Sequence, residues 1–316
     1  MQTEIVSAIF VVPSRESAPE RSSMSEVFLQ ACGKVNLGLD IIRRREDGYH
    51  EVDMILQMVD LWDDLVLKKV PEPGIYLTAN KESIPCDEHN LIWKAIAMLQ
   101  EEFSLPGGVS CALTKRIPVA AGMAGGSTDA AAALIGMNRL FELGLTTEQL
   151  QERGVRLGAD VPYCIAGGTM HAGGIGEILT KLPSPPECAV LIVKPFIGVS
   201  TRFVYDNLKI ETRGAYPHVD MAGVKKGLEA GSLEQIGTSL GNILECVTIP
   251  AHPIIARIKD QMEQMGAVRA LMSGSGPTVF GLFRTEDEAQ AACKQLESEL
   301  GTEADCYVTH FCEGRW

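Results

Sequence analysis

Three glycines stand directly before an Ala-rich segment with helical character, in the stretch IPVAAGMAGGSTDAA at residues 117–131. Gly122, Gly125 and Gly126 carry no side chains, so backbone N–H groups in this loop can approach an anion closely. The N-terminus of a helix adds a favourable potential for negative charge, and phosphate is an anion that such loops bind. The loop Pro118–Thr128 is therefore a candidate phosphate site, with a plain turn before a helix as the alternative.

The loop matches neither of two common nucleotide motifs, because no Gly-Lys-Ser/Thr closes it and it does not follow the pattern GxGxxG. A second glycine loop, SGSGP at Ser273–Pro277, stands between two apolar segments. By itself this second loop is typical of a hairpin turn. Taken with the first loop, it predicts a cleft between two domains.

The chain carries 41 Asp and Glu against 28 Lys and Arg, a formal net charge of −13. Such a field repels nucleic acid phosphates and anionic lipid, so we expect neither nucleic acid nor a membrane as a partner. A polyanionic small molecule would need a positive potential that is built locally. The glycine loop offers one.

Nine cysteines are scattered from Cys32 to Cys312 without a Cys-x-x-Cys or His-x-x-x-His pair, which favours free thiols in a reducing cytoplasm over zinc or redox motifs. No stretch reaches about 18 unbroken apolar residues. The polar, Pro/Ser-rich residues 13–25 predict a disordered leader over residues 1–24, with Met24 as an alternative start. We expect a cytoplasmic protein.

The first periodic segment, residues 34–41, alternates apolar and polar side chains, which predicts a strand with Val35, Leu37, Leu39 and Ile41 on one apolar face. Further strands are expected after Asp47-Gly48 to about 59, and at 65–70, 75–78, 109–114, 167–178, 189–193, 268–272, 277–283 and 305–311. Helices are expected at 91–103, from a Ser127 or Thr128 N-cap to 143, from a Thr146 or Thr147 N-cap to 157, and at 200–208, 220–230, 232–244, 253–265 and 286–299.

Helices and strands are mixed rather than alternating strictly, which favours an α+β fold over a doubly wound sheet. At about 150 residues per domain, the 316 residues predict two domains. The run PSPPE at 183–187 cannot continue a helix or strand, so we place the boundary there, with domains at 25–182 and 183–316.

Four segments together resemble the GHMP small-molecule kinases. They are GKVNLGLDIIRRREDGYHEVDMIL at 33–56, IPVAAGMAGGSTDAA at 117–131, LGADVPYC at 157–164 and LMSGSGPTVFGLF at 271–283. Within the family, KVNLGL and DGYHEV are characteristic of the branch whose substrate carries a cytidine diphosphate group, in the non-mevalonate route to isoprenoid precursors. The resemblance implies an N-terminal domain like ribosomal protein S5 domain 2, a ferredoxin-like C-terminal domain, and both substrates in the cleft between them.

The resemblance implies that Lys34 and Asp160 are the catalytic pair of a phosphoryl transfer from ATP to a small-molecule alcohol. Asp160 would be the general base, and Lys34 would hold it and stabilise the developing negative charge. From the residues alone, the alternative for Lys34 is a solvated strand lysine, although it shares the polar face with Asn36, which would line a cleft. For Asp160, the residues alone favour a turn residue.

The resemblance further implies ATP and Mg²⁺ as cofactors. The residues it places at the nucleotide are Asn90, Lys115, Pro118, Val119, Ala120, Ala121, Gly122, Met123, Ala124, Gly125, Gly126, Ser127 and Thr128. The hydroxyl of Ser127 or Thr128 would lie near Mg²⁺, and no pair of carboxylates with metal-ligand spacing is apparent.

At the acceptor substrate, the resemblance places Asn36, Tyr49, His50 and Tyr205. Two aromatic faces could sandwich the cytosine, while a ring or backbone group reads its edge. Alternatively, Tyr49 covers a neighbouring strand and Tyr205 faces the core from a helix. A monomer or a weak homodimer is expected.

The sequence departs from the family at Cys32-Gly33, where Pro-Ala is usual, and at Ser127-Thr128, where Ser-Ser is common. Both changes are small. The alternatives are another GHMP kinase, acting on homoserine, a sugar or mevalonate, and a catalytically silent relative that binds a nucleotide or sugar. DGYHEV disfavours the first alternative, and the presence of both Lys34 and Asp160 disfavours the second.

Overall fold

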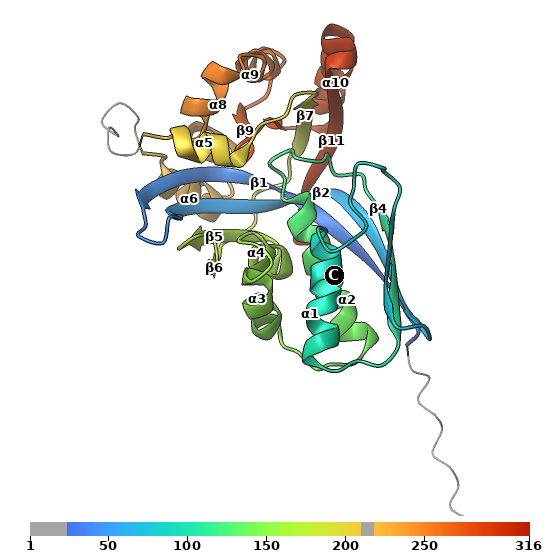
Figure 1. Cartoon of the computed structure of the whole chain (residues 1–316). Helices are drawn as coiled ribbons and strands as arrows, with labels where there is room; N and C mark the ends of the chain where they lie inside the picture. The colour runs from blue at the N-terminus through green and yellow to red at the C-terminus, as the bar shows by residue number, and fades with distance from the viewer. Residues whose placement is uncertain (1–23, 210–217) are drawn as a thin grey trace, which may run out of the picture.

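The structure, a computed structural model, describes residues 24–209 and 218–316. All but the last residue of the predicted leader, 1–24, lies outside the described residues. Two long antiparallel strands, β1 (Glu26–Arg44) and β2 (His50–Val70), form the centre of the fold (Figure 1). Over the described ranges, no helix combines the length and the apolar character needed to cross a membrane.

The first half of the chain adds further strands and a layer of helices to this pair. In chain order these are β3 (Gly74–Ala79), α1 (Leu91–Glu102), β4 (Gly108–Thr114), α2 (Gly125–Leu140), α3 (Thr147–Val155), α4 (Val161–Ala166), β5 (Thr169–Gly173) and β6 (Ile178–Lys181). β4 pairs with the second part of β2, β3 pairs with β4, and β5 pairs with the first part of β2. α2 packs on β1 and β2 and lies beside α1 (Figure 1).

The second half of the chain builds another sheet with its own helices. Its elements are β7 (Ala189–Pro195), α5 (Thr201–Asn207), α6 (Met221–Ala230), α7 (Leu233–Ser239), β8 (Gly241–Asn242), α8 (Glu245–Ala251), α9 (Ile254–Gln264), β9 (Arg269–Met272), β10 (Val279–Phe283), α10 (Glu286–Leu300), η2 (Gly301–Glu303) and β11 (Ala304–Cys312). β7 lies between β10 and β11, and β9 pairs with the far side of β10. The predicted α+β class is confirmed.

β11 joins the two sheets. It pairs with β7 over Ala304–His310 and then with β2 through Phe311 and Cys312. The boundary that we predicted at residues 182 and 183 falls in the connection between β6 and β7.

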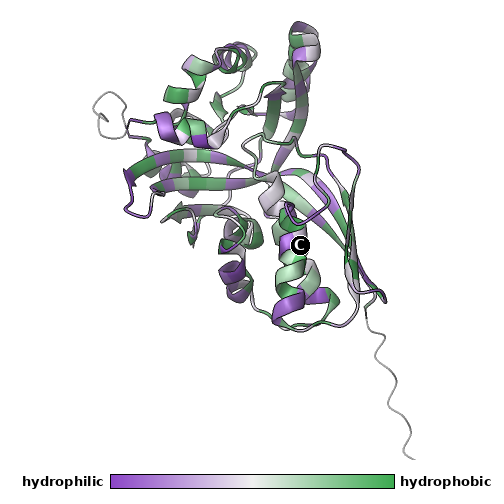
Figure 2. Ribbon diagram, viewed as in Figure 1, coloured by the Kyte–Doolittle hydropathy of each residue, from purple (hydrophilic) through white to green (hydrophobic). Residues whose placement is uncertain are grey.

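A bulge divides the apolar face predicted for β1. The β1–β2 register slips between Asn36 and Gly38, so the alternation of side chains reverses there. Val35 and Leu37 pack in the smaller of two cores, with Val190 and Ile192 of β7, whereas Leu39 and Ile41 belong to the main core, which contains residues of both halves of the chain. The prediction of a single apolar face was therefore wrong, and both faces of β1 are covered. Figure 2 shows the alternation of hydropathy along β1 and β2.

Helix α2 begins earlier than the sequence predicts. Its N-cap is Ala124, in the left-handed conformation with φ 56°, and not Ser127 or Thr128. No side chain caps the first turn. The backbone of the glycine loop therefore leads directly into the helix, and the N–H groups of the first turn have no side-chain acceptor.

Candidate active site

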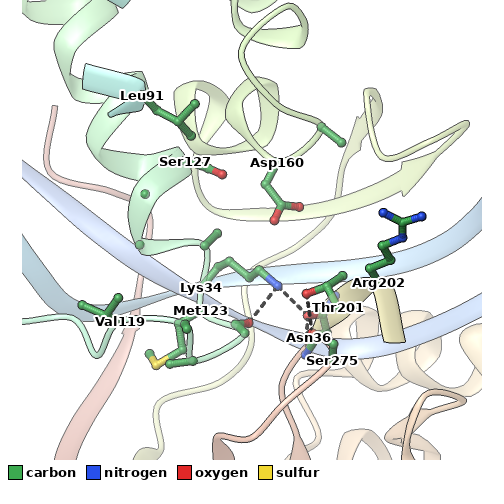
Figure 3. Close-up of a pocket in the computed structure, with 18 of the residues that line it drawn as sticks. Lys34, Asn36, Leu91, Val119, Met123, Ser127, Asp160, Thr201, Arg202 and Ser275 are labelled. Carbon is green, nitrogen blue, oxygen red and sulfur yellow. Dashed lines mark hydrogen bonds between the residues drawn. The ribbon is translucent and has the colours of Figure 1, made fainter. Parts of the chain in front are cut away.

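A cavity of about 870 Å³ opens where the glycine loop, the β1–β2 pair and α5 meet (Figure 3). All but one of the residues that we predicted for the nucleotide and acceptor sites line this cavity. These are Lys34, Asn36, Tyr49, His50, Asn90, Lys115, Pro118–Ser127, Asp160 and Tyr205. The exception is Thr128, which is buried inside α2. Of the two hydroxyls considered for Mg²⁺, only that of Ser127 is in the cavity.

The glycine loop has an unusual backbone. Ala120, Gly122 and Ala124 have positive φ angles of 51°, 72° and 56°. For alanine this conformation is disfavoured, so the surrounding packing must hold it. The α2 N-terminus and the loop backbone both border the cavity, and this combination suits an anion.

The two glycine loops pack against each other, and both border the cavity. Ser273 Oγ donates a 2.9 Å hydrogen bond to the carbonyl oxygen of Gly122. A Cβ on Gly122 would lie 2.2 Å from the backbone oxygen of Ser273, so no larger residue fits there. Gly274 and Ser275 of the second loop also line the cavity.

The other two glycines of the first loop face different surroundings. A Cβ on Gly125 would point inward, 2.9 Å from Lys115 Nζ, whereas a Cβ on Gly126 would meet nothing closer than Leu91 at 4.0 Å. Gly126 is exposed and lines the cavity. It is therefore at Gly126 that a side chain would enter the space open to a ligand.

Lys34 is buried and held by two acceptors. Its ammonium donates to Asn36 Oδ1 at 2.8 Å and to the Gly122 carbonyl at 3.1 Å, while its backbone N–H donates to Met123. Asn36 Oδ1 also accepts from the backbone N–H of Gly274 at 3.1 Å. Lys34 thus contacts the first glycine loop directly and is connected to the second one through the amide oxygen of Asn36.

Asp160 stands at the start of α4 and lines the same cavity. Figure 3 shows it across from Lys34, with its carboxylate turned toward the same part of the cavity. Among the contacts of the described residues, no hydrogen bond or ion pair joins Asp160 to Lys34. The expected contact between Lys34 and Asp160 is therefore not made in this structure, in which the ammonium donates to Asn36 and the Gly122 carbonyl.

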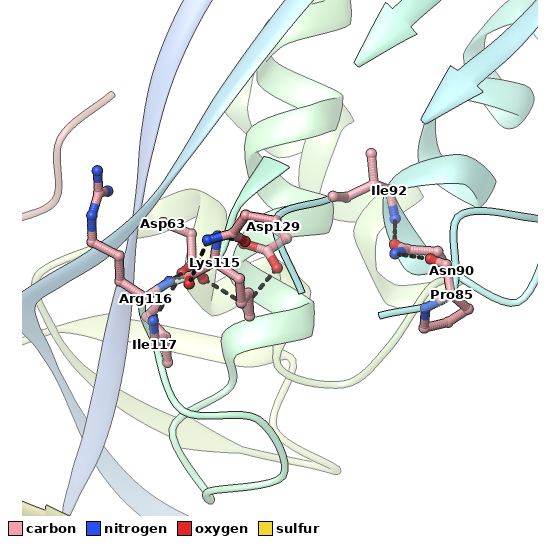
Figure 4. Close-up of polar contacts among 9 residues, drawn as sticks. Asp63, Pro85, Asn90, Ile92, Lys115, Arg116, Ile117 and Asp129 are labelled. Atoms are coloured by element: carbon pink, nitrogen blue, oxygen red, sulfur yellow. Dashed lines mark hydrogen bonds and ion pairs between the residues drawn. The ribbon is translucent and has the colours of Figure 1, made fainter. Parts of the chain in front are cut away.

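Lys115 is the centre of a buried charge cluster beneath the loop (Figure 4). Its ammonium lies 2.5 Å from Asp63 Oδ2 and 2.6 Å from Asp129 Oδ2. Asp63 Oδ1 also accepts from the backbone N–H groups of Arg116 and Ile117, at 2.5 and 2.8 Å. The ammonium predicted to contact the nucleotide is thus bound to two carboxylates of the protein.

Two acidic groups in this cluster share one lysine. Burial raises the pKa of Asp129 well above its usual range, with Lys115 opposing and Asp63 reinforcing that shift. Burial lowers the pKa of Lys115, but the carboxylates of Asp129 and Asp63 outweigh it and the net shift is upward. Asp129 Oδ1 is buried without a hydrogen-bond partner, as suits a carboxyl in which the charged form is disfavoured.

Asn90 is the N-cap of α1 and uses its side chain within the chain. Its Oδ1 accepts from the N–H of Ile92 at 2.8 Å, and its Nδ2 donates to the carbonyl of Pro85 at 2.7 Å (Figure 4). The residue lines the cavity, so this hydrogen-bonded loop and cap form part of the wall beside the glycine loop.

The aromatic residues lie at another part of the cavity. The rings of His50 and Tyr205 contact each other, with centroids 5.1 Å apart and planes tilted by 49°. Tyr49 is 60% exposed. Tyr205 also packs partly against the core, as the alternative interpretation held, and still borders the cavity.

Sequence reasoning missed several residues around the cavity. Thr201 and Arg202 begin α5, and Thr201 Oγ1 lies 2.9 Å from Ser275 Oγ. Asp63 was also missed, although an acidic residue inside an apolar strand such as VDLWDDLVL is a signal for a buried ion pair.

Comparison with known proteins gives a consistent result. Family models for the GHMP kinases N terminal domain and the GHMP kinases C terminal domain match residues 90–168 and 224–302. A 4-diphosphocytidyl-2-C-methyl-D-erythritol kinase of Lachnospira eligens is 46% identical over 286 residues, covering 90% of this chain and 98% of that protein. A Bacillus cereus protein of the same name is 48% identical over 258 residues, covering 81% of this chain and 88% of that one.

The solved structures agree with these relatives. A crystal structure of 4-(cytidine 5'-diphospho)-2C-methyl-D-erythritol kinase aligns with a TM-score of 0.78 at 31% identity, over 91% of this chain and all of that one. A homoserine kinase from Cytophaga hutchinsonii aligns with a TM-score of 0.76 at 20% identity, over 94% of this chain and 98% of that one, which shows the shared fold alone. The two-domain GHMP fold expected from the sequence is confirmed. The chain belongs to the 4-diphosphocytidyl-2-C-methyl-D-erythritol kinases of the GHMP family.

Proposed function

We propose that this protein transfers the γ-phosphoryl group of ATP to the 2-hydroxyl of 4-diphosphocytidyl-2-C-methyl-D-erythritol, in the non-mevalonate route to isoprenoid precursors. One observation carries the proposal. Lys34 and Asp160 line a single cavity that has the glycine loop on one side and the His50–Tyr205 ring pair on another. The names of the relatives support this choice of substrate over another GHMP kinase substrate.

The acceptor hydroxyl must lose a proton while its oxygen attacks the γ-phosphorus and the bond to ADP breaks. We assign that proton to the carboxylate of Asp160, which lines the cavity. Lys34 has three N–H donors, and two of them are used by Asn36 and the Gly122 carbonyl. The third is available to the transferring phosphoryl group, where a fixed positive charge stabilises the developing negative charge.

The glycine loop binds the phosphates of ATP through its backbone. The positive φ angles at Ala120, Gly122 and Ala124 shape the loop, and the uncapped first turn of α2 supplies N–H groups. The packing of Ser273 on Gly122 fixes the loop before a ligand arrives. Lys115 acts through its contacts with Asp63 and Asp129 and so supports the loop from below.

The oxygen donors of the cavity fit a hard cation. The Ser127 hydroxyl would lie near Mg²⁺, which phosphate oxygens and water would mainly hold, and the ion would neutralise charge on the triphosphate. Hydroxyl and phosphate oxygens are of the donor type that Mg²⁺ prefers, and the carboxylate of Asp160 stays available for the acceptor's proton. Thr128 is excluded from this role by its burial inside α2.

The cytosine of the acceptor lies at the aromatic end of the cavity. Tyr49 and Tyr205 offer two ring faces, and His50 offers a ring edge that can hydrogen-bond to the base. Asn36 lies beside Lys34 and faces the part of the substrate that reacts. We also propose a cytoplasmic monomer or weak homodimer. The nine free cysteines support a reducing compartment, and the net charge of −13 disfavours nucleic acid and membrane partners.

The test is release of ADP by the purified protein with Mg-ATP and a panel of acceptors. The panel holds 4-diphosphocytidyl-2-C-methyl-D-erythritol, homoserine, galactose and mevalonate. We expect turnover of the cytidyl compound alone. Turnover of another acceptor would refute the proposed substrate, and ATP binding without any turnover would indicate a catalytically silent relative.

A further inference from the structure

Two cysteines from opposite ends of the chain meet in the fold. Cys32 lies on β1 and Cys312 on β11, and their sulfur atoms lie within 4.8 Å of each other and of a carboxylate oxygen of Asp60. Cys32 is buried, with 1% of its surface exposed, whereas Cys312 and Asp60 are half-buried. The proposed function does not use this cluster.

The sheet register explains how the three residues come together. The β1–β2 pairing shifts between Cys32 and Gly33, so that Asp60 and Leu61 form a bulge in β2. After β11, the chain continues along β1, where Arg315 forms a bridge with Gln30. The bulge therefore brings the carboxylate of Asp60 close to Cys32, and the bridge brings the thiol of Cys312 close to it.

Thiolate sulfur and carboxylate oxygen are both ligands that the borderline-soft cation Zn²⁺ accepts. Zn²⁺ binds thiolate sulfur at about 2.3 Å and carboxylate oxygen at about 2.0–2.2 Å, so ligand atoms within 4.8 Å of one another can reach one ion by small side-chain rotations. Binding releases the two thiol protons to solvent and leaves a fourth position for water. Asp87, Glu88 and His89 also cluster, but all three are exposed and lack thiol ligands.

Arg315 completes the charge balance of the cluster. Its guanidinium donates to both carboxylate oxygens of Asp60, at 2.5 and 2.7 Å, and lies 3.9 Å from the ring centroid of Trp62. Each carboxylate oxygen retains a further lone pair, so Asp60 can bind a cation while Arg315 orients it. Two thiolates, one carboxylate, one Zn²⁺ and one Arg sum to zero charge.

We propose that Cys32, Asp60 and Cys312 form a binding site for a soft divalent cation of the Zn²⁺ type. The ion links the first strand of the fold to β11, the strand that joins both sheets. It lies two residues along β1 from Lys34 and is separate from the substrate cavity.

The test uses the full chain, kept reduced by a phosphine, and Co²⁺ as a spectroscopic substitute for Zn²⁺. We expect one equivalent of Co²⁺ to give a thiolate-to-cobalt charge-transfer band, which one equivalent of Zn²⁺ displaces. Cys32→Ser and Cys312→Ser should each lose most of the band, and Asp60→Asn should weaken binding. Cys246→Ser is the matched control, a half-buried cysteine outside the cluster, and should keep the band.

A second measurement is the melting temperature with and without Zn²⁺. An ion that binds only the folded chain raises it, and each cluster variant that folds should lose this rise. If Cys32→Ser does not fold, Cys312→Ser decides alone, because its side chain is half-buried. Absence of the band in the unaltered protein, or a band that survives both cysteine changes, would overturn the proposal.

Discussion

The ammonium of Lys115 lies 2.6 Å from Asp129 Oδ2, and these two residues stand at the two ends of the glycine loop. Lys115 precedes the loop and Asp129 follows it in α2, so their contact closes the loop across its base. Asp63, in β2, fixes the N-terminal end of the loop. It pairs with Lys115 and accepts hydrogen bonds from the N–H groups of Arg116 and Ile117. The conformation of the glycine loop therefore depends on this buried charge cluster.

Removing the lysine of this cluster should be strongly destabilising. Lys115→Met keeps the length of the side chain but leaves two buried carboxyl groups without a cation, and such a loss costs about 3–5 kcal/mol. Arg116→Met is the control, because Arg116 pairs with Asp64 at the surface, where an ion pair contributes about 1 kcal/mol or less. Urea unfolding measures the free energy of unfolding of both variants. Equal losses in Lys115→Met and Arg116→Met would contradict a buried charge cluster.

Asp129→Asn should alter how stability depends on pH. The raised pKa of Asp129 means that its protonated form stabilises the fold, and this contribution is lost as the pH rises from about 4 toward the folded-state pKa. Asparagine is neutral at every pH. We expect the variant to match the unaltered protein near pH 4 and to exceed its free energy of unfolding at pH 8.

Urea unfolding at several pH values checks this, with Asp305→Asn, at an exposed aspartate of β11, as the control. If the difference in free energy of unfolding between Asp129→Asn and the unaltered protein instead grows toward low pH, the pKa of Asp129 is shifted in the opposite direction.

Two glycines of the loop should respond differently to valine. Gly126→Val places its side chain in open space at the cavity, so the protein should fold and its KM for ATP should rise. Gly125→Val directs its side chain at Lys115 and Ile117, so its main effect should be a lower melting temperature. Melting temperature and KM for ATP separate the two effects. An unchanged KM in Gly126→Val would remove the loop from the ATP site.

The aromatic end should govern binding of the cytidyl substrate. Tyr205→Ala and Tyr49→Ala should raise the KM for that substrate more than the KM for ATP, since a stacking face contributes about 1–3 kcal/mol per base. Tyr205 should show the larger effect, because Tyr49 is 60% exposed. Tyr76→Ala, at an exposed tyrosine of β3 outside the cavity, should change neither KM. A rise in the KM for ATP alone would assign the aromatic end to the wrong nucleotide.

Asp160→Asn and Lys34→Ala should fold, bind ATP and lose kcat. Loss of a general base costs about 10²- to 10⁴-fold in rate, and loss of an electrostatic stabiliser costs about 10²- to 10³-fold. If the two residues act as a unit, the double variant should be little slower than the slower single variant. Steady-state kinetics and ATP titration provide the measurements. Near-normal turnover by Asp160→Asn would mean that the hydroxyl loses its proton without this base.

Local signals in the sequence predicted the parts of the fold that local interactions determine. The glycine loop and α2 were predicted because glycine content and helical periodicity are local, although the N-cap at Ala124 was not. Helices α4 and α8 were missed, since each is short and contains a proline. Outside the glycine loop, the residues of the cavity were predicted from motif resemblance and not from periodicity.

Contacts between segments that are distant in the sequence could not be predicted from these local signals. The bulge after Asn36, which reverses the faces of β1, depends on the pairing partner in β2. Likewise, the carboxylates that surround Lys115 lie far from it in sequence, and spacing does not show that they meet. Cys32 and Cys312 are brought together only by the register of three strands.

The double pairing of β11 has a consequence for the order in which the protein folds. β11 follows every other strand in the chain, yet it completes the pairing of β7 and also contacts the middle of β2. The contact with β2 joins segments separated by most of the chain, and closing such a long loop is slow. During synthesis, neither sheet can reach its final pairing until residues 304–312 have left the ribosome, so the two halves should complete their folding together.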